Sequence, residues 1–165
     1  TQTAVRVRSG SPDEQVEFAR NVELWQRLLL PGVLRPFVSG VSREIPYVGV
    51  LVVGKGLKPG WLDGAPRTQL QERLIEICAL LHAVALAGVR LPDADARRFS
   101  LDACGRVWLT DAWGAEPSST DEASRAHATS VFRWLSALVA SEAASAPPAS
   151  ITELVARIEA SQPRQ

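Results

Sequence analysis

Apolar and polar residues recur with clear periods in the first third of the chain. Residues 3–8 alternate between the two classes, which is typical of a strand with one buried face. A capping pattern that begins at Ser11 then predicts a helix over residues 13–30, ended by Pro31 and Gly32. Its apolar residues are spaced by four, three and four, which places them on one buried face. They are Phe18, Val22, Trp25 and Leu29.

Two strands are predicted after this helix. Residues 34–39 and 47–53 are rich in β-branched and other apolar side chains. The second segment is apolar at both odd and even positions, so we expect both of its faces to be covered. Residues 54–60 contain three glycines and a Pro-Gly pair, which indicates a flexible connector.

Helical periods dominate the rest of the chain. Residues 68–87 carry the strongest helical pattern, with Gly88 where a C-terminal cap belongs. Residues 98–101 and 106–110 are predicted to pair as a β-hairpin. Helices are then expected over residues 119–140 and from residue 150 onward, each opened by a capping pattern.

This order predicts an α+β fold, because strands come first and helices dominate later. We expect a single domain over residues 1–165, with a small strand-rich lobe at 1–56 and a helical lobe at 57–165. The small lobe would hold an antiparallel sheet and one helix. The large lobe would be mainly helical and would include the hairpin.

The amino-acid composition limits the classes of partner that we expect for this chain. The chain has 165 residues, of which 46% are hydrophobic and 22% are charged, and its formal net charge is zero. These values are typical of a globular protein and predict no nucleic-acid partner. No apolar run approaches the roughly 20 residues that span a bilayer, so no membrane insertion is expected within this chain. Cys78 and Cys104 lack zinc-site spacing and are expected to be thiols of a cytoplasmic protein. The lack of Met is consistent with a domain from a longer protein.

Several segments, in chain order, resemble the protein-kinase family. Residues 4–7 (Ala-Val-Arg-Val) are similar to the strand that carries Ala-x-Lys, and residues 13–34 to helix C and the entry into the next strand. Residues 88–93 (Gly-Val-Arg-Leu-Pro-Asp) match the segment Gly-Ile-Val-His-Arg-Asp. Residues 99–111 resemble the hairpin that leads into Asp-Phe-Gly. The resemblance covers most of residues 3–140 by pattern and order.

The resemblance implies a pocket without its phosphoryl-transfer groups. Arg6 stands at the lysine position, Asn21 near the glutamate that would pair with it, and Arg98 at the metal-binding asparagine. Asp93 matches the catalytic aspartate and Asp111 the metal aspartate. Because an arginine cannot ligate Mg²⁺ and no glycine-rich loop precedes residue 3, we expect a pseudokinase without cofactor, metal or catalytic residue.

The expected function is therefore that of a protein-binding or scaffolding module, which the family resemblance places in the cytoplasmic regulatory part of a larger bacterial protein. In some bacterial pseudokinases the domain is phosphorylated and then docks a phosphothreonine-reading domain. Thr120 is the candidate acceptor here, although Thr120 or Ser119 can equally serve as a helix cap. Trp61 and Trp113 lie in predicted loops, where they are either core residues or anchors for a partner.

Two other functions stay open at this point. One is weak nucleotide binding or residual phosphotransfer by Asp93 and Asp111 with a divalent metal. The other is a small adaptor of unrelated α+β fold. A nucleophilic hydrolase is disfavoured, because no Gly-x-Ser-x-Gly segment is present.

Overall fold

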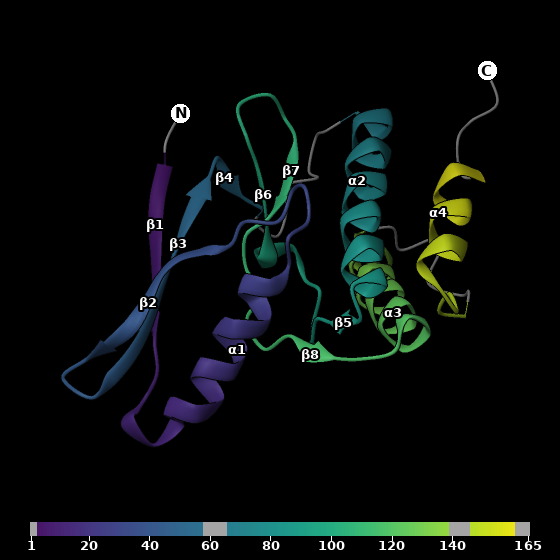
Figure 1. The fold of residues 1–165 in the computed structure, drawn as a ribbon. Helices are drawn as coiled ribbons and strands as arrows, with labels where there is room; N and C mark the ends of the chain where they lie inside the picture. The colour runs from purple at the N-terminus through teal and green to yellow at the C-terminus, as the bar shows by residue number, and fades with distance from the viewer. Residues whose placement is uncertain (1–2, 58–65, 139–145, 161–165) are drawn as a thin grey trace. The chain divides into compact units, whose positions relative to one another are not determined.

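The computed structural model describes residues 3–57, 66–138 and 146–160. Over these residues the chain is a mixed α and β protein with small antiparallel sheets and four α-helices (Figure 1), which confirms the predicted mixture. The chain divides into two compact units. The strand-rich unit comprises Thr1–Leu57 and Arg97–Glu116, and the helical unit comprises Lys58–Ala96 and Pro117–Gln165.

A three-stranded antiparallel sheet is the frame of the strand-rich unit. Its strands are β1 (Thr3–Ser9), β2 (Pro36–Ser42) and β3 (Ile45–Val53), in the order β1-β3-β2. Helix α1 (Gln15–Arg27) packs on β2 and β3. Val48, Val50 and Val52 on the inner face of β3 are buried, whereas the residues between them are more exposed or are glycine. One face of the central strand is therefore open, and the expectation that both of its faces are covered was wrong, since Ile45 and Leu51 are exposed on that face.

Helix α1 buries the predicted apolar face only in part. Phe18, Val22 and Trp25 are buried, but Leu29 is 70% exposed and the neighbouring Leu28 is buried. The prediction for Leu29 was wrong because the helix ends at Arg27. Leu28 then adopts φ −73° and ψ 77°, which is not helical, so the four-residue spacing no longer returns the chain to the same face.

A second small sheet is formed by β4 (Lys55–Gly56), β6 (Phe99–Leu101) and β7 (Val107–Leu109), in the order β4-β6-β7. It begins at Gly54, whose φ is +78° and whose position would put a Cβ atom 1.8 Å from the Leu101 carbonyl oxygen. Only glycine fits there. The first part of the predicted connector is thus an ordered turn and strand, while residues 58–60 lie outside the described range.

Residues 97–116 cluster with the strand-rich unit, although the sequence places them in the helical lobe. The reason is a set of backbone hydrogen bonds to the segment after α1. The Leu34 N–H donates to the Leu109 carbonyl at 2.9 Å, and the Leu109 N–H donates to the Gly32 carbonyl at 2.8 Å. The Trp25 indole N–H also donates to the Leu34 carbonyl at 2.9 Å. These contacts hold β7 beside the end of α1.

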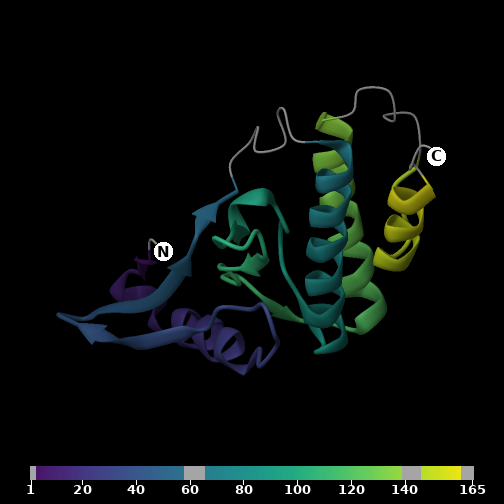
Figure 2. The same cartoon turned by 90° about the horizontal axis from the view of Figure 1, so that it is seen from above.

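The helical unit is built from α2 (Arg67–Leu86), α3 (Thr120–Leu138) and α4 (Ile151–Ala160). The three helices pack on one another (Figures 1 and 2), and the short strands β5 (Val89–Arg90) and β8 (Glu116–Pro117) pair as a two-stranded ladder. As predicted, Gly88 follows α2, with φ +73°. No helix within the described residues is both long and apolar enough to span a membrane.

His127 on α3 is fully buried in this unit. Its Nε2 atom accepts the Leu91 N–H at 2.9 Å, and its Nδ1 atom lies 3.1 Å from the Leu81 carbonyl oxygen. Because Nε2 is an acceptor, the ring proton belongs on Nδ1, where it is donated to that carbonyl. The neutral ring of His127 therefore joins α3 to α2 and to the residue that follows β5.

Candidate functional site

Two arginines of β1 point to the covered side of the three-stranded sheet. Arg6 pairs across the ladder with Val50 and Arg8 with Val48, and both valines are buried. Since paired residues share a sheet face, the two arginine side chains start from the inner face. Each side chain is about two-fifths exposed (42% and 41%), so their guanidinium groups reach the edge of the covered region.

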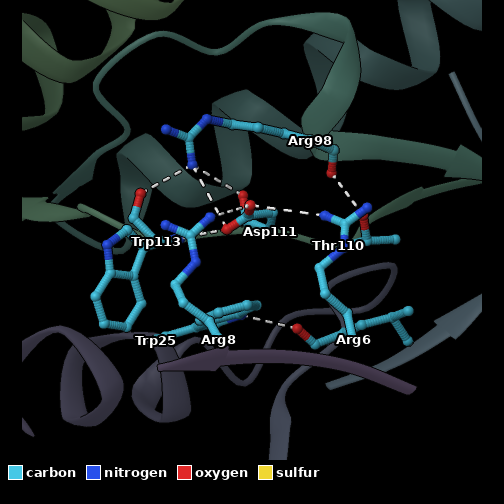
Figure 3. Close-up of polar contacts among 8 residues, drawn as sticks. Arg6, Arg8, Trp25, Arg98, Thr110, Asp111 and Trp113 are labelled. Carbon is cyan, nitrogen blue, oxygen red and sulfur yellow. Dashed lines mark hydrogen bonds and ion pairs between the residues drawn. The ribbon is translucent and has the colours of Figure 1, made fainter. Parts of the chain in front are cut away.

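Asp111 is the carboxylate that these arginines meet (Figure 3). It follows β7 by two residues and its side chain is only 12% exposed. Its Oδ2 atom lies 3.1 Å from Arg8 Nη2 and 3.7 Å from Arg6 Nη1. Its Oδ1 atom lies 3.9 Å from Nη1 of Arg98. We call these four residues the Asp111 cluster: one carboxylate faces three guanidinium groups.

Arg98 fastens the turn that carries Asp111. Its Nη1 atom donates to the carbonyl oxygens of Asp111, at 3.1 Å, and of Trp113, at 2.9 Å. Its own carbonyl oxygen accepts the N–H of Thr110 at 2.7 Å and the Thr110 hydroxyl at 3.0 Å. The side chain is 15% exposed. Arg98, which the sequence resemblance aligned with a metal-binding asparagine, therefore holds this turn together through backbone carbonyls.

Trp113 completes the turn and covers the base of α1. Its backbone N–H donates to Asp111 Oδ1 at 2.9 Å. Its ring lies 4.6 Å from the Phe18 ring, tilted by 57°, and the Arg8 guanidinium carbon lies 4.9 Å from its centroid. Trp113 also packs on the buried cluster of Phe18, Val22 and Val48. This residue is thus partly buried and is held by an aromatic and a cation–π contact.

A cavity of about 210 Å³ adjoins the cluster on the α1 side. Arg8, Phe18 and Trp113 line it together with five further residues. Those are Ser9 of β1, Gly10 and Glu14 of the segment between β1 and α1, and Glu17 and Asn21 of α1. The Ser11 N–H donates to the Glu14 carboxylate at 3.0 Å, and this bond holds the pKa of Glu14 below its usual value. The cavity therefore combines aromatic surface with charges of both signs.

The residues predicted from sequence are brought together only in part. Asn21 lines the cavity, and its amide donates to the Glu17 carbonyl at 3.0 Å. Arg6 pairs with Asp111 and not with α1. Asp93 is exposed and belongs to the helical unit, where its carbonyl oxygen accepts the Asp95 N–H at 2.8 Å. Within one unit, the structure therefore brings Arg6, Arg98 and Asp111 together, and Asn21 lines the adjoining cavity.

The other two candidate partner contacts have different outcomes. Trp61 lies outside the described residues. Thr120 is the first residue of α3, but the Ser119 hydroxyl accepts the Glu122 N–H at 3.3 Å and caps the helix. Of the two capping alternatives, the structure selects Ser119.

Arg8 is the site residue that the sequence analysis missed. A signal was present, because Arg6 and Arg8 are two residues apart on a strand and must share a face. That face packs toward buried valines, so two cations there require a nearby carboxylate or an open path to water. Its counterion, Asp111, lies 103 residues further along the chain. Strand periodicity does not indicate which acidic residue packs beside Arg8 in the fold.

Both side-chain oxygen atoms of Asp111 have partners within the strand-rich unit. One Asp111 oxygen accepts the Trp113 N–H, and the other faces two arginines. Over residues 3–57, 66–138 and 146–160, no three histidine, cysteine or acidic side chains are grouped as a metal site requires.

No protein-family model matches the chain, and no curated protein matches it significantly.

Proposed function

We propose that this chain is a catalytically inactive relative of the protein-kinase fold that works as a protein-binding module. Two features support the proposal, and they lie on opposite faces of the β1-β3-β2 sheet. The Asp111 cluster on the inner side argues against phosphoryl transfer. The apolar surface on the outer side supports binding of a protein partner.

The arginine contacts of Asp111 count against phosphoryl transfer. A residue that binds Mg²⁺ must offer oxygen lone pairs in a site that other cations do not already occupy. At an effective dielectric constant of about 20, a divalent ion and a guanidinium about 5 Å apart repel by roughly 7 kcal/mol. Solvent screens the part due to the half-exposed Arg6 and Arg8, but Arg98 is well buried. The alternative of a metal-dependent nucleotide enzyme is therefore disfavoured.

The open face of the sheet is the observation that carries the binding function. Register with β3 places Val5, Val7 and Val38 on this face. Phe37 joins them, because its ring lies over Gly49. Ile45 and Leu51 of β3 complete the surface, and the six side chains are between 37% and 64% exposed. The other described positions of the face are uncharged, namely Ser9, Gly40, Ser42, Tyr47, Gly49 and Val53.

Such a surface is unusual for water-exposed strands, which normally carry polar side chains on the open face. Contiguous apolar patches of this kind mark protein-interaction sites. Because the face carries no charge, the partner it fits is a protein with an uncharged, apolar surface of its own. We name these six apolar residues the outer-face patch.

Site-specific cross-linking in the source cell tests this function. A photoreactive benzophenone side chain at Val7 should cross-link a discrete partner. The same side chain at Leu86 on α2 serves as the matched control, because Val7 is 64% exposed and Leu86 is 63% exposed. Val7→Lys should then abolish the isolated complex, while Leu86→Lys should leave it intact.

Three results would contradict the proposal. Equal labelling from Val7 and Leu86 would show that the patch is not selective. A product of twice the chain's mass would identify a second copy in place of a partner protein. Transfer of radiolabel from ATP to any protein by this chain alone would show that it is an enzyme.

A further inference from the structure

Arg6 and Arg8 bring more positive charge to Asp111 than its one carboxylate can balance. Their guanidinium groups lie 3.7 and 3.1 Å from the same carboxylate oxygen. Glu14 and Glu17 line the cavity beside Arg8, but neither forms an ion pair with it among the described residues. An excess of positive charge therefore faces the solvent at β1.

Arg6 is the least satisfied member of this cluster. Its one interaction with the described residues is the 3.7 Å ion pair with Asp111, a separation too long for a hydrogen bond. Its guanidinium nitrogens thus have no hydrogen-bond acceptor within the described part of the protein. Arg8 makes one hydrogen bond to Asp111 and the stacking contact with Trp113. Both arginines therefore have guanidinium N–H groups that make no hydrogen bond with the described residues, and both side chains are about two-fifths exposed.

The two arginines are also arranged to act together. They are two residues apart on the same face of β1, and both reach the same oxygen of Asp111. Their guanidinium ends therefore converge on one carboxylate oxygen. Guanidinium forks match the oxygen spacing of phosphate groups and bind them bidentately. A phosphate monoester carries close to two negative charges at neutral pH, which suits the local excess.

We propose that Arg6 and Arg8 form a metal-independent binding site for a phosphate monoester, in which the phosphate competes with Asp111 for the arginines. This inference goes beyond the protein-binding function, since the site lies on the inner face and the outer-face patch takes no part in it. The phosphate can belong to a nucleotide or to a phosphorylated side chain. Asp111 then acts as the resident anion that the ligand displaces.

The decisive experiment is a calorimetric titration with phenyl phosphate in buffer that contains EDTA. The wild-type chain should bind without any metal. Arg6→Gln should weaken binding by about fivefold or more, because it removes a charged fork. Arg20→Gln is the matched control, since Arg20 is an exposed arginine of α1 outside the cluster, and it should stay within about twofold of wild type.

Asp111→Asn gives the sharpest contrast, because the site should bind phenyl phosphate several-fold more tightly once the competing carboxylate is neutral. A metal-dependent site would do the opposite and lose binding. Circular dichroism confirms that each variant is folded, and Arg6→Lys, which keeps the charge and loses the fork, should fall between wild type and Arg6→Gln.

The proposal is overturned if the wild-type chain fails to bind in EDTA, if Arg6→Gln behaves like Arg20→Gln, or if Asp111→Asn weakens binding. Adenosine monophosphate and a phosphothreonine peptide then distinguish the source of the phosphate. Equal affinity for both supports recognition of the phosphate alone, and a preference for one identifies the ligand class. The Val7 cross-linking result does not depend on any of these outcomes.

Discussion

Replacing Asp111 with alanine removes the only carboxylate of the cluster, and its cost follows from the contacts that are lost. The Trp113 N–H loses its acceptor at 2.9 Å, and Arg8 loses a hydrogen bond at 3.1 Å. Arg98 keeps two carbonyl acceptors but loses its nearby negative charge. Arg6 becomes a cation without a counterion in the described structure.

These losses differ in their free-energy cost. An orphaned, part-buried N–H costs about 1–3 kcal/mol. The contact with the half-exposed Arg8 is screened by water and contributes at most about 1 kcal/mol. Removing the negative charge beside the mostly buried Arg98 adds a cost of similar size, which is softened by its two carbonyl partners. We therefore expect Asp111→Ala to destabilise the strand-rich unit by about 2–4 kcal/mol, and Asp111→Asn by less because the amide oxygen still accepts the Trp113 N–H.

Native-state hydrogen exchange measures this change one unit at a time. In Asp111→Ala, amides of the central strand β3 should exchange about 30- to several hundred-fold faster, which is the stated energy at 1.4 kcal/mol per factor of ten. Amides of α2 belong to the helical unit and serve as the internal control, so their rates should stay close to those of the wild-type chain.

Two results would refute this reasoning. An acceleration of less than about threefold in β3 would mean that the ion pairs contribute almost nothing. Slower exchange would be more damaging. It would show that Asp111 is a strained carboxylate kept at a cost in stability, as residues reserved for a ligand or metal often are.

Three further predictions concern residues outside the cluster. His127→Ala should destabilise the helical unit by about 3 kcal/mol, measured by exchange of α2 amides, because two buried backbone groups lose their partner. The pKa of Asp102 is lowered by an indole N–H and two backbone N–H donors, so its contribution to stability is present above the ordinary value of 3.8 and disappears as the pH falls below it. Urea unfolding at pH 7 and pH 3 should thus show a smaller acid-induced loss for Asp102→Asn than for wild type. Burial raises the pKa of Cys78 to about 12, whereas Cys104 is exposed, so a thiol reagent should modify Cys104 at once and Cys78 only in denaturant.

Much of the fold follows from local pattern. Strand β1, the cap at Gly88 and the long helix α2 were predicted because alternation, glycine and apolar spacing act over a few residues. The two-residue strand β4 was missed, since it exists only through pairing with Leu101 and Ser100. Leu29 was misplaced because the end of α1 depends on backbone geometry that spacing does not encode.

Less of the candidate site than of the fold could be predicted from the sequence. Family resemblance drew attention to Arg6, Arg98 and Asp111, and the structure brings all three together. Resemblance could not reveal that Arg6 pairs with Asp111, or that Arg98 binds backbone carbonyls. Those contacts depend on where β7 is fastened beside α1, which is a property of the folded unit.

The claim on which the account depends is that Asp111 is engaged by arginines and does not hold a metal ion. Electron paramagnetic resonance of Mn²⁺ without nucleotide tests it directly, because the signal of free Mn²⁺ falls when the ion is bound by the protein. We predict that Asp111→Asn takes up at least as much Mn²⁺ as the wild-type chain does. Uptake by wild type that disappears in Asp111→Asn would contradict it.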